Sequence, residues 1–386
     1  MPRTLHITGS AGADCDAVLL RETHSFVDQV VSGWTSRGGT IVAGVAGSPT
    51  HQDDSDLSII FDWTVISAVA RAVRQGGAQS YGTNGPALVL RGSRRAYEQV
   101  PEWGAALLTD LTEAGALDLR LLPDTWRSGA LVRREQADVG GILMTLSGGA
   151  GVEDLVNLYA ANGRPVVPID VSLGSSQRDG AQGGGTGLAR RAMSNPAAFL
   201  RLADGSPPGA RLAALSMGGV RPAPAVLAER ALKLLNDLEL PRAFCVRLLN
   251  ADHEHFGDVE RFFRDVSDPV LSETGLRVID LSQERQDGAW MNAEIFEHIY
   301  RSDTVLVDLT GQRPNCYMEL GYALGRGHRI IVTARAGERL PFDADKLPCH
   351  FWSTAQPSRE SQDLLREHLR KFGTRAPLVA AARLVG

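Results

Sequence analysis

Short apolar segments alternate with helical patterns along most of the chain, and this alternation constrains the fold more than any other feature. Such an alternation is typical of parallel sheets, because each parallel connection crosses back over the sheet, usually as a helix. In the first half, the expected strands are Thr4–Thr8, Thr40–Val45, Ala87–Leu90, Leu117–Leu122, Gly141–Leu146 and Pro165–Val171. In the second half, they are Phe244–Leu249, Arg277–Leu281, Thr304–Leu309 and Arg329–Thr333.

A stretch rich in glycine and proline, Ala203 to Pro224, separates the two series of strands. With 386 residues, the chain can form two or three domains that each bury a core. The sequence therefore predicts an α/β protein with two Rossmann-like, three-layer domains. We place the first domain at residues 1–205, a linker and connecting helix at 206–240, and the second domain at 241–386.

Composition excludes several classes of protein. No apolar run reaches the ~18 residues of a membrane span, and the N-terminus lacks a signal-peptide pattern, so we expect a cytoplasmic protein without membrane partners. The net charge of −5 predicts no nucleic-acid partner. The four cysteines are scattered without a C-x-x-C pair, which predicts reduced thiols and no metal site.

The most informative stretch runs from Asp303 to Ala323. A buried strand ends at Asp308, a polar loop follows, and a helix begins near Asn315. These polar groups are expected at the carboxyl edge of the sheet, where open α/β sheets bind ligands. Asn315 is a natural helix cap, and Glu319 falls within the first turns, where the helix dipole favours an ionised carboxylate.

An ionised carboxylate in a closed cleft suits cleavage of an N-glycosidic bond. The sugar carbon passes through an oxocarbenium-like state, which a nearby anion stabilises or traps covalently. The alternative is that Glu319 only complements the helix dipole and Asp308 only ends a strand.

This stretch closely resembles the nucleoside 2-deoxyribosyltransferase-like superfamily, a relative of TIR-type NAD hydrolases. The resemblance covers roughly residues 242–352, and its motifs are Asp308-Leu-Thr-Gly, Arg313-Pro-Asn315 and Tyr317-Met-Glu319-Leu-Gly-Tyr-Ala. It implies that Glu319 is the catalytic nucleophile. The expected substrate-binding residues are Asn315, Tyr317, Arg313, Thr310 and Glu294.

Arg313 and Glu294 are the two residues of this set for which the sequence leaves alternatives open. Arg313 stands where many relatives have asparagine. Glu294 lies four residues before His298, so both side chains share one helix face. Relatives use an acidic residue of this helix to hold the sugar, whereas the alternative is a solvated helix face.

The leaving group bears on the choice of substrate. Nicotinamide leaves NAD as a neutral molecule and needs no proton donor, whereas a purine or pyrimidine usually must be protonated. One carboxylate is therefore enough for NAD, which would be a substrate and not a cofactor. A nucleoside would need an acid such as Asp308, our second catalytic candidate, or His298. The alternative is a nucleoside or nucleoside-monophosphate glycosidase, or a deoxyribosyltransferase, of nucleotide metabolism.

Glycine turns follow two strands of the first half, at Gly9 and at Gly148, an arrangement that brings backbone amides close to phosphate, and the glycine-containing segment Gly38 to Gly44 forms the strand between them. Arg133 and Arg134 suit bidentate phosphate contacts. The predicted signal-binding residues are Gly9, Ser10, Gly44, Arg133, Arg134, Gly148, Gly149 and Gly151.

The ordered set of turns resembles a SLOG domain, the LOG and Smf/DprA-like group that includes phosphoribohydrolases and nucleotide sensors of bacterial defence proteins. The match covers roughly residues 3–202, but Leu155 stands at the position of the catalytic glutamate of LOG enzymes. This departure favours binding over hydrolysis, although Glu153 could substitute from a different direction.

Together, the two resemblances imply an antiphage effector. The first domain would bind a nucleotide-derived signal, and association into a homo-oligomer would activate the N-glycosidase of the second domain, because the signal must favour the active assembly. A further alternative is that both halves are non-catalytic sensors.

Overall fold

The computed structural model describes residues 4–45, 47–76, 85–125, 127–161, 163–174, 184–218, 222–239, 241–274, 276–279, 291–341, 344 and 346–372. The chain divides into two compact units, with the boundary after Glu239. Within the described part of the chain, no helix is both long and apolar enough to cross a membrane.

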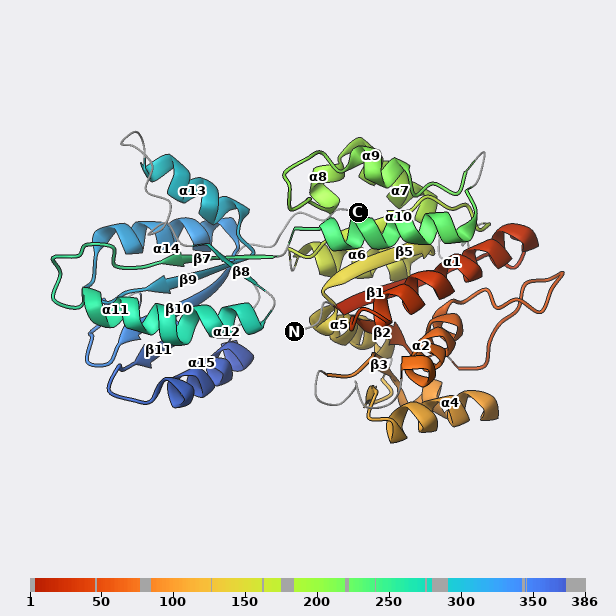
Figure 1. Ribbon diagram of the computed structural model, residues 1–386, viewed down its shortest axis with the longest axis horizontal. Coiled ribbons are helices and arrows are strands. Elements are labelled where there is room, and N and C mark those ends of the chain that lie inside the picture. The colour runs from red at the N-terminus through yellow and green to blue at the C-terminus, as the bar shows by residue number, and fades with distance from the viewer. Residues whose placement is uncertain are drawn as a thin grey trace. The chain divides into compact units, whose positions relative to one another are not determined.

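The first unit is built on a six-stranded, all-parallel sheet in the order β4-β3-β2-β1-β5-β6 (Figure 1). Its strands are β1 (Thr4–Ser10), β2 (Thr40–Gly44), β3 (Leu88–Ser93), β4 (Leu117–Leu122), β5 (Ile142–Ser147) and β6 (Val166–Ile169). Its helices are α1 (Ala17–Thr35), α2 (Asp62–Gly76), α3 (Arg94–Glu98), α4 (Glu102–Glu113), α5 (Ser128–Val139), α6 (Ala150–Ala161), α7 (Gly184–Ser194), α8 (Pro196–Phe199), α9 (Gly209–Ala213) and α10 (Pro224–Asp237).

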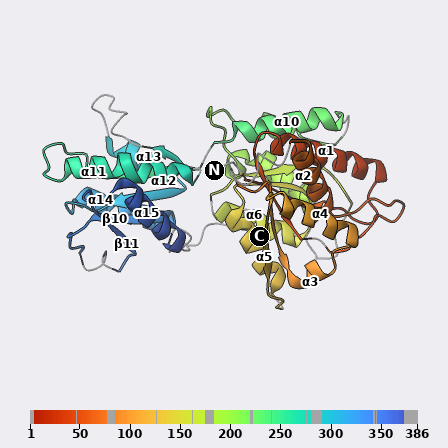
Figure 2. The same cartoon turned by 60° about the horizontal axis from the view of Figure 1, so that its bottom comes forward.

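The strand order of this sheet reverses between β1 and β5. The chain lays down β1 to β4 in one direction and then returns to place β5 on the other side of β1. In Figure 2, α1, α2 and α4 lie on one side of the strands, and α5 and α6 lie on the other. The register pairs Ser10 with Ser147 at the carboxyl edge. This edge is the topological switch point, where doubly wound sheets bind ligands.

The segment expected to be a linker packs as part of the first unit. Leu227, Ala231 and Leu235 of α10 are buried in its core, and Leu232 lies against Gly33 of α1. A backbone bridge between Leu202 and Leu238 closes the segment. The expected connecting helix is present as α10, and the segment packs within the first unit. Pro224 occupies the first turn of this helix, where proline is well tolerated.

The second unit contains a five-stranded parallel sheet in the order β11-β10-β9-β7-β8. Its strands are β7 (Arg242–Val246), β8 (Arg277–Ile279), β9 (Thr304–Asp308), β10 (Arg329–Arg335) and β11 (Cys349–Trp352). Its helices are α11 (Phe256–Phe262), α12 (Asp268–Glu273), α13 (Met291–Arg301), α14 (Pro314–Arg326) and α15 (Ser358–Phe372), with a π-helical turn at Phe263–Ser267. The order reverses between β7 and β9, so the carboxyl ends of these strands form a second switch point.

Alternate residues of the second sheet enter two separate cores. Ala243 and Cys245 of β7 pack with α11 and α15, whereas Phe244 and Val246 pack with α13 and α14. Figure 1 shows α13 and α14 on one face of this sheet and α11, α12 and α15 on the other. The predicted three-layer α/β architecture is confirmed.

The edge strand β11 was not expected from the sequence. Its residues Cys349 to Trp352 include a buried histidine and an exposed phenylalanine, so no simple apolar pattern marks it. Pairing of Val332 with Cys349 adds it to the sheet beside β10.

Close packing of β1 on β5 yields a prediction about Gly9. A Cβ at this position would lie 2.1 Å from the carbonyl oxygen of Leu146, which is backbone and cannot move aside. We expect Gly9→Ala to lower the free energy of unfolding by about 1–3 kcal/mol, the usual range for overpacking. Gly209→Ala is the matched control, because its Cβ would make only an ordinary contact with Pro196. Equal denaturation midpoints for the two variants would contradict this packing.

Candidate functional site

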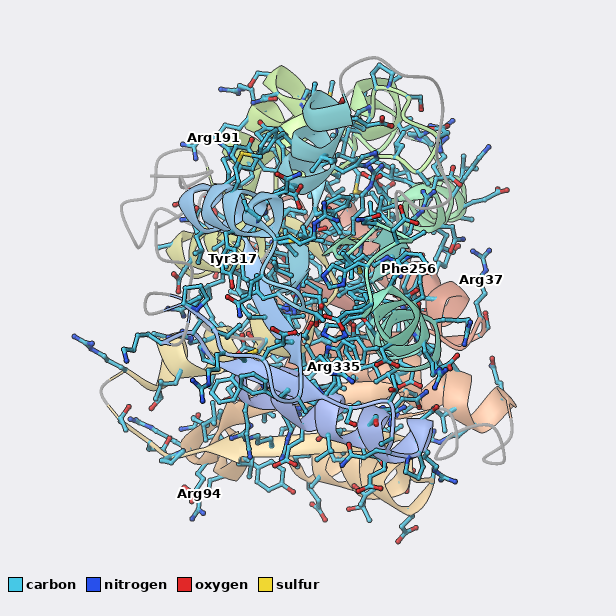
Figure 3. The ribbon with its side chains drawn as sticks, turned by 90° about the vertical axis from the view of Figure 1, so that its left-hand side faces the viewer. Arg37, Arg94, Arg191, Phe256, Tyr317 and Arg335 are labelled. Atoms are coloured by element: carbon cyan, nitrogen blue, oxygen red, sulfur yellow. The ribbon has the colours of Figure 1, made fainter. Side chains whose placement is uncertain are left out.

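The switch point of the second sheet gathers the loops that follow β7, β9 and β10. The loop after β9 leads into α14, which begins at Pro314. Figure 3 looks onto this side of the molecule, with Tyr317 of α14, Phe256 of α11 and Arg335 of β10 labelled. Segments far apart in the sequence therefore contribute polar side chains to one edge of the sheet.

Glu319 lies in the second turn of α14, and its side chain is almost buried, with 9% exposed. Burial raises the pKa of its carboxyl to about 7, against a smaller lowering by the nearby guanidinium of Arg313. We expected the helix dipole to keep this carboxylate ionised, and that expectation is corrected. The dipole acts mainly within the first turn, and Glu319 is one turn further along.

Asp308 is fully buried at the end of β9. Its Oδ2 accepts hydrogen bonds from Thr333 Oγ1 and Trp352 Nε1, both at 2.7 Å, and its Oδ1 accepts one from the Thr310 amide at 3.1 Å. Burial raises its pKa, although these hydrogen bonds act in the opposite direction. Asp308 thus ties β9 to β10, β11 and the loop before α14.

The charges of both carboxyl groups affect the pKa of the Cys316 thiol. Burial first, and then the charges of Glu319 and Asp308, raise its pKa to about 12. Both carboxyl groups are therefore near enough to act on the electrostatics of this buried thiol. It lies on the face of α14 that packs against the sheet.

The predicted substrate-binding residues of the loop and α14 differ in exposure. Thr310 is buried, and its hydroxyl oxygen accepts the Arg335 amide. Asn315 is exposed and does not cap the helix, because Arg313 occupies the cap position and Pro314 the first turn. Tyr317 is partly buried, and burial raises its pKa. Within the described residues, its hydroxyl is buried without a hydrogen-bond partner.

Glu294 lies on α13, where the predicted pairing with His298 is present. The two side chains approach to 3.8 Å, and the imidazole of His298 stacks on Phe244 of β7. Glu294 remains half exposed at 50%.

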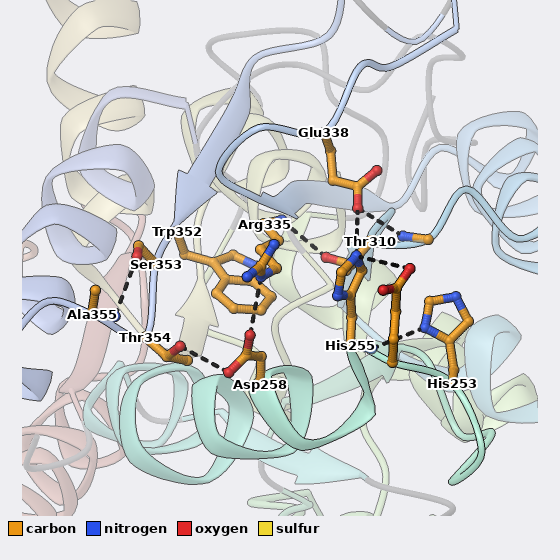
Figure 4. Close-up of polar contacts among 12 residues, drawn as sticks. His253, His255, Asp258, Thr310, Arg335, Glu338, Trp352, Ser353, Thr354 and Ala355 are labelled. Atoms are coloured by element: carbon orange, nitrogen blue, oxygen red, sulfur yellow. Dashed lines mark hydrogen bonds and ion pairs between the residues drawn. The ribbon is translucent and has the colours of Figure 1, made fainter.

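A group of residues at the same edge was missed from the sequence (Figure 4). His253 and His255 follow β7, with ring centroids 5.5 Å apart. His255 Nε2 lies 3.8 Å from Oε1 of Glu338, which also accepts the amide of Gly311 at 3.2 Å. The signal was the run Asn-Ala-Asp-His-Glu-His directly after an apolar strand, because carboxyl strand ends at a switch point carry functional groups.

A second polar cluster lies at the same edge of the sheet, beside α11. Asp258 receives hydrogen bonds from Arg335 Nε at 3.1 Å and Thr354 Oγ1 at 2.9 Å. These bonds, the one from Thr354 foremost, lower the pKa of Asp258 despite an opposing contribution from desolvation. Figure 4 shows these residues beside Trp352. This cluster fixes β10 and the chain after β11 against α11.

In the first unit, the turn between β5 and α6 is the better candidate for phosphate binding. Ser147 has a φ of 55°, a left-handed conformation that is strained for a residue with a side chain and often marks functional turns, and Gly148 beside it has a φ of 104°. Arg133 of α5 bonds Asp154 of α6 at 2.6 Å, and its guanidinium lies beside Gly151. The structure thus brings together Arg133 with the turn that contains Gly148, Gly149 and Gly151.

The turn after β1 is already occupied by backbone contacts. The amide of Ala11 donates to Ile59 and that of Gly12 to Leu173, and Asp16 caps the start of α1 with a carboxylate. Gly9 and Ser10 lie beside the β5 turn, but the amides that follow them are not free for phosphate.

The other predicted residues of the first unit, Gly44 and Arg134, lie away from the β5–α6 turn in sequence, and Leu155 lies on α6. Gly44 lies against the carboxyl of Asp62 and the amide of Gln136, and burial raises the pKa of Asp62 to about 7. Arg134 is exposed on α5. Leu155 packs in the core at 3% exposure, so no carboxylate occupies that position.

In the described part of the chain, no three His, Cys, Asp or Glu side chains are arranged so that they could hold a metal ion. None of the four cysteines is linked in a disulfide.

The family described as "ATP nucleosidase Cap17-like, N-terminal" matches residues 1–219. Two curated relatives, both called ATP nucleosidase Cap17 and both from Escherichia coli, one of them strain KTE188, are 27% identical over 175 residues. The matched part is 45% of this chain and 33% of each relative, so the chain covers about a third of their length.

Two solved structures align over nearly the whole chain but with low scores. A glycotransferase of kitacinnamycin has 11% identity and a TM-score of 0.23, over 97% of this chain and 92% of the other. A glycosyltransferase from Rickettsia africae ESF-5 has 9% identity and a TM-score of 0.17, over 96% and 92%. Scores this low carry no argument about fold.

The contacts of Asp308 yield a prediction that separates positioning from catalysis. Asp308→Ala would leave the Trp352 indole and Thr333 hydroxyl without their acceptor, so we expect the free energy of unfolding to fall by about 3 kcal/mol. Tryptophan fluorescence during urea unfolding measures the effect. Asp363→Ala, at an exposed position on α15, is the control. An unchanged midpoint together with lost activity would instead make Asp308 a catalytic group.

Proposed function

The chain belongs to the ATP nucleosidase Cap17-like family through its N-terminal region, and from this premise we propose that it is an effector that hydrolyses the N-glycosidic bond of a nucleotide. The second unit carries the reaction and the first unit binds a nucleotide-derived signal. The proposal rests chiefly on one observation, the nearly buried carboxyl of Glu319 at a switch-point edge. Resemblance of this segment to nucleoside deoxyribosyltransferases supports the assignment.

Glu319 is proposed as the nucleophile. Its carboxylate attacks C1′ of the ribose as the bond to the base breaks, and the electron pair leaves with the base nitrogen. Water then attacks C1′, releases the carboxylate and loses a proton to solvent. A departing purine or pyrimidine takes one proton from solvent, whereas nicotinamide leaves neutral and takes none, and in either case one water is consumed and free base is released from the ribose phosphate.

Asp308, Tyr317 and Arg313 have different tasks in this mechanism. Asp308 is a positioning residue, because its hydrogen bonds hold the loop and β11 around α14. The buried hydroxyl of Tyr317 is available to a ribose hydroxyl. The guanidinium of Arg313 lowers the pKa of Glu319, so it favours the nucleophilic form and can also contact a phosphate.

The first unit supports the sensing half of the proposal. The strained β5–α6 turn and Arg133 provide amides and a cation for phosphate, and buried Leu155 removes the carboxylate that LOG-type hydrolysis uses. Binding would favour an active homo-oligomer, because an effector that consumes a cellular nucleotide needs an inactive state. An antiphage setting follows from the resemblance to SLOG fusions.

Chromatography of released bases tests the proposal. The purified chain is incubated with NAD, ATP, nucleosides and nucleoside monophosphates, each with and without cyclic nucleotides and cyclic ADP-ribose. Base released from NAD or ATP only with a signal supports the gated effector. Base released from nucleosides or monophosphates without a signal points to nucleotide metabolism. If no base is released under any condition, the result supports the sensor alternative.

Removing the carboxylate gives a second prediction. Glu319→Gln keeps the shape of the side chain but cannot form the glycosyl ester, so we expect base release to fall by about 10³-fold or more. Glu297→Gln, at an exposed position on α13, should retain wild-type rates. Equal rates for Glu319→Gln and wild type would remove Glu319 from the mechanism.

The pH dependence gives a third prediction for this site. Only the ionised carboxylate is a nucleophile, and its pKa is about 7. The rate of base release should therefore rise with pH, about tenfold per unit below pH 7, and level off above it. A rate that falls as pH rises through 7 would make Glu319 the general acid and contradict its role as nucleophile.

A further inference from the structure

A cavity opens in the first unit where α7 and α9 pack beside β6. Its volume is about 140 Å³, close to the ~150 Å³ of an engineered protein cavity that takes up one benzene ring. Its apolar walls are formed by Pro168, Ala189, Ala192, Met193, Leu212 and Ala213. The cavity therefore suits a single flat ring and is too small for a whole nucleotide.

The polar groups that line this cavity are those of Asp170 and Ser216, and they face it as hydrogen-bond acceptors. The hydroxyl of Ser216 donates its one proton to Oδ2 of Asp170 at 2.7 Å and accepts the amide of Gly218 at 3.1 Å. Oδ1 of Asp170 accepts no hydrogen bond from any residue that the structure describes. A ligand must therefore bring the donors.

The cavity lies next to the turn that we assign to phosphate. The register pairs Leu146 of β5 with Ile169 of β6, so Ser147 and Asp170 end neighbouring strands at the same edge of the sheet. Neighbouring strands are about 4.8 Å apart, so one ligand can place a phosphate at the turn and a ring in the cavity. None of the residues that line the cavity is a lysine or an arginine, which leaves the phosphate to the turn and Arg133.

The nucleobases differ in the donors that they present side by side. Guanine carries N1–H and an exocyclic amino group at adjacent positions. The amino groups of adenine and cytosine adjoin a ring nitrogen that is an acceptor, and the N3–H of uracil lies between two carbonyl groups. Guanine alone among these bases thus offers two adjacent donors to a cavity whose polar groups are acceptors.

We propose that this cavity is the base subsite of the first unit, in which Asp170 accepts hydrogen bonds from N1–H and the amino group of a guanine ring. This inference rests on the sensing role proposed above and names the base of the signal. Met193 lines the cavity and is 43% exposed, so its flexible thioether can cover the outer face of the ring.

Isothermal titration calorimetry of the full chain with GMP, IMP and AMP tests the proposal. IMP keeps N1–H but lacks the amino group, and AMP presents an acceptor at N1. Asp170→Asn keeps the shape of the side chain and an acceptor for Ser216, whereas Ala192→Leu fills the cavity. Asp56→Asn, at an exposed position of the same unit, is the matched control. Agmatine supplies a guanidinium without a ring, and thermal melting shows that each variant folds.

We expect the wild type to bind GMP about tenfold or more tightly than IMP or AMP, because charge-assisted hydrogen bonds are lost with the other two. In Asp170→Asn this preference should fall to about threefold or less. Ala192→Leu should weaken GMP binding about tenfold or more, and Asp56→Asn should match the wild type. A merely structural role of Asp170 would leave the preference between ligands unchanged.

The proposal is overturned if the wild type binds GMP and IMP equally, if the preference persists in Asp170→Asn, or if agmatine binds more tightly than GMP. Absence of GMP binding overturns it as well. Base release from ATP and NAD, measured in the same samples, keeps the proposed function separate. GMP bound through Asp170 without an effect on base release would support the subsite and contradict gating. Gating by a nucleotide that binds independently of Asp170 would support the function and overturn the subsite.

Discussion

The hydrogen bonds accepted by Asp308 are the contacts on which the rest of the second unit depends. One buried carboxyl at the end of β9 binds Thr333 of β10, Trp352 of β11 and the amide of Thr310 in the next loop. Three strands and the loop before α14 are thereby held in one arrangement. The position of Glu319 follows from it, because α14 begins directly after that loop.

Both units place their candidate sites by the same rule of topology. In each sheet the strand order reverses once, and the carboxyl ends beside the reversal carry the residues discussed above. The chemistry of the two edges differs. The first offers a strained turn and Arg133, which suit a phosphate, whereas the second offers Glu319 and Tyr317, which suit a sugar. This difference is the physical basis for assigning sensing to one unit and hydrolysis to the other.

Much of the fold could be predicted because apolar runs of strand length mark central parallel strands directly. The edge strand β11 escaped, since its Cys-His-Phe-Trp sequence has no clear apolar pattern. The segment 206–240 was predicted to be a linker and connecting helix, and the helix is present, but the sequence does not show that its leucines pack in the core of the first unit. Glu319 was found from its motif, yet its burial and pKa depend on packing that no local pattern specifies. His253 was missed because only the sheet brings it beside Gly311.

The most direct test of the central claim, that Glu319 is the nucleophile of a nucleotide N-glycosidase, is covalent trapping. A nucleotide with fluorine at C2′ destabilises the oxocarbenium-like state and slows hydrolysis of a glycosyl ester, so the intermediate can accumulate. The labelled protein is digested and its peptides are analysed by mass spectrometry. The account predicts a fluorosugar phosphate on Glu319 and none in Glu319→Gln. A label on another residue, or base release without any label on the protein, would contradict it.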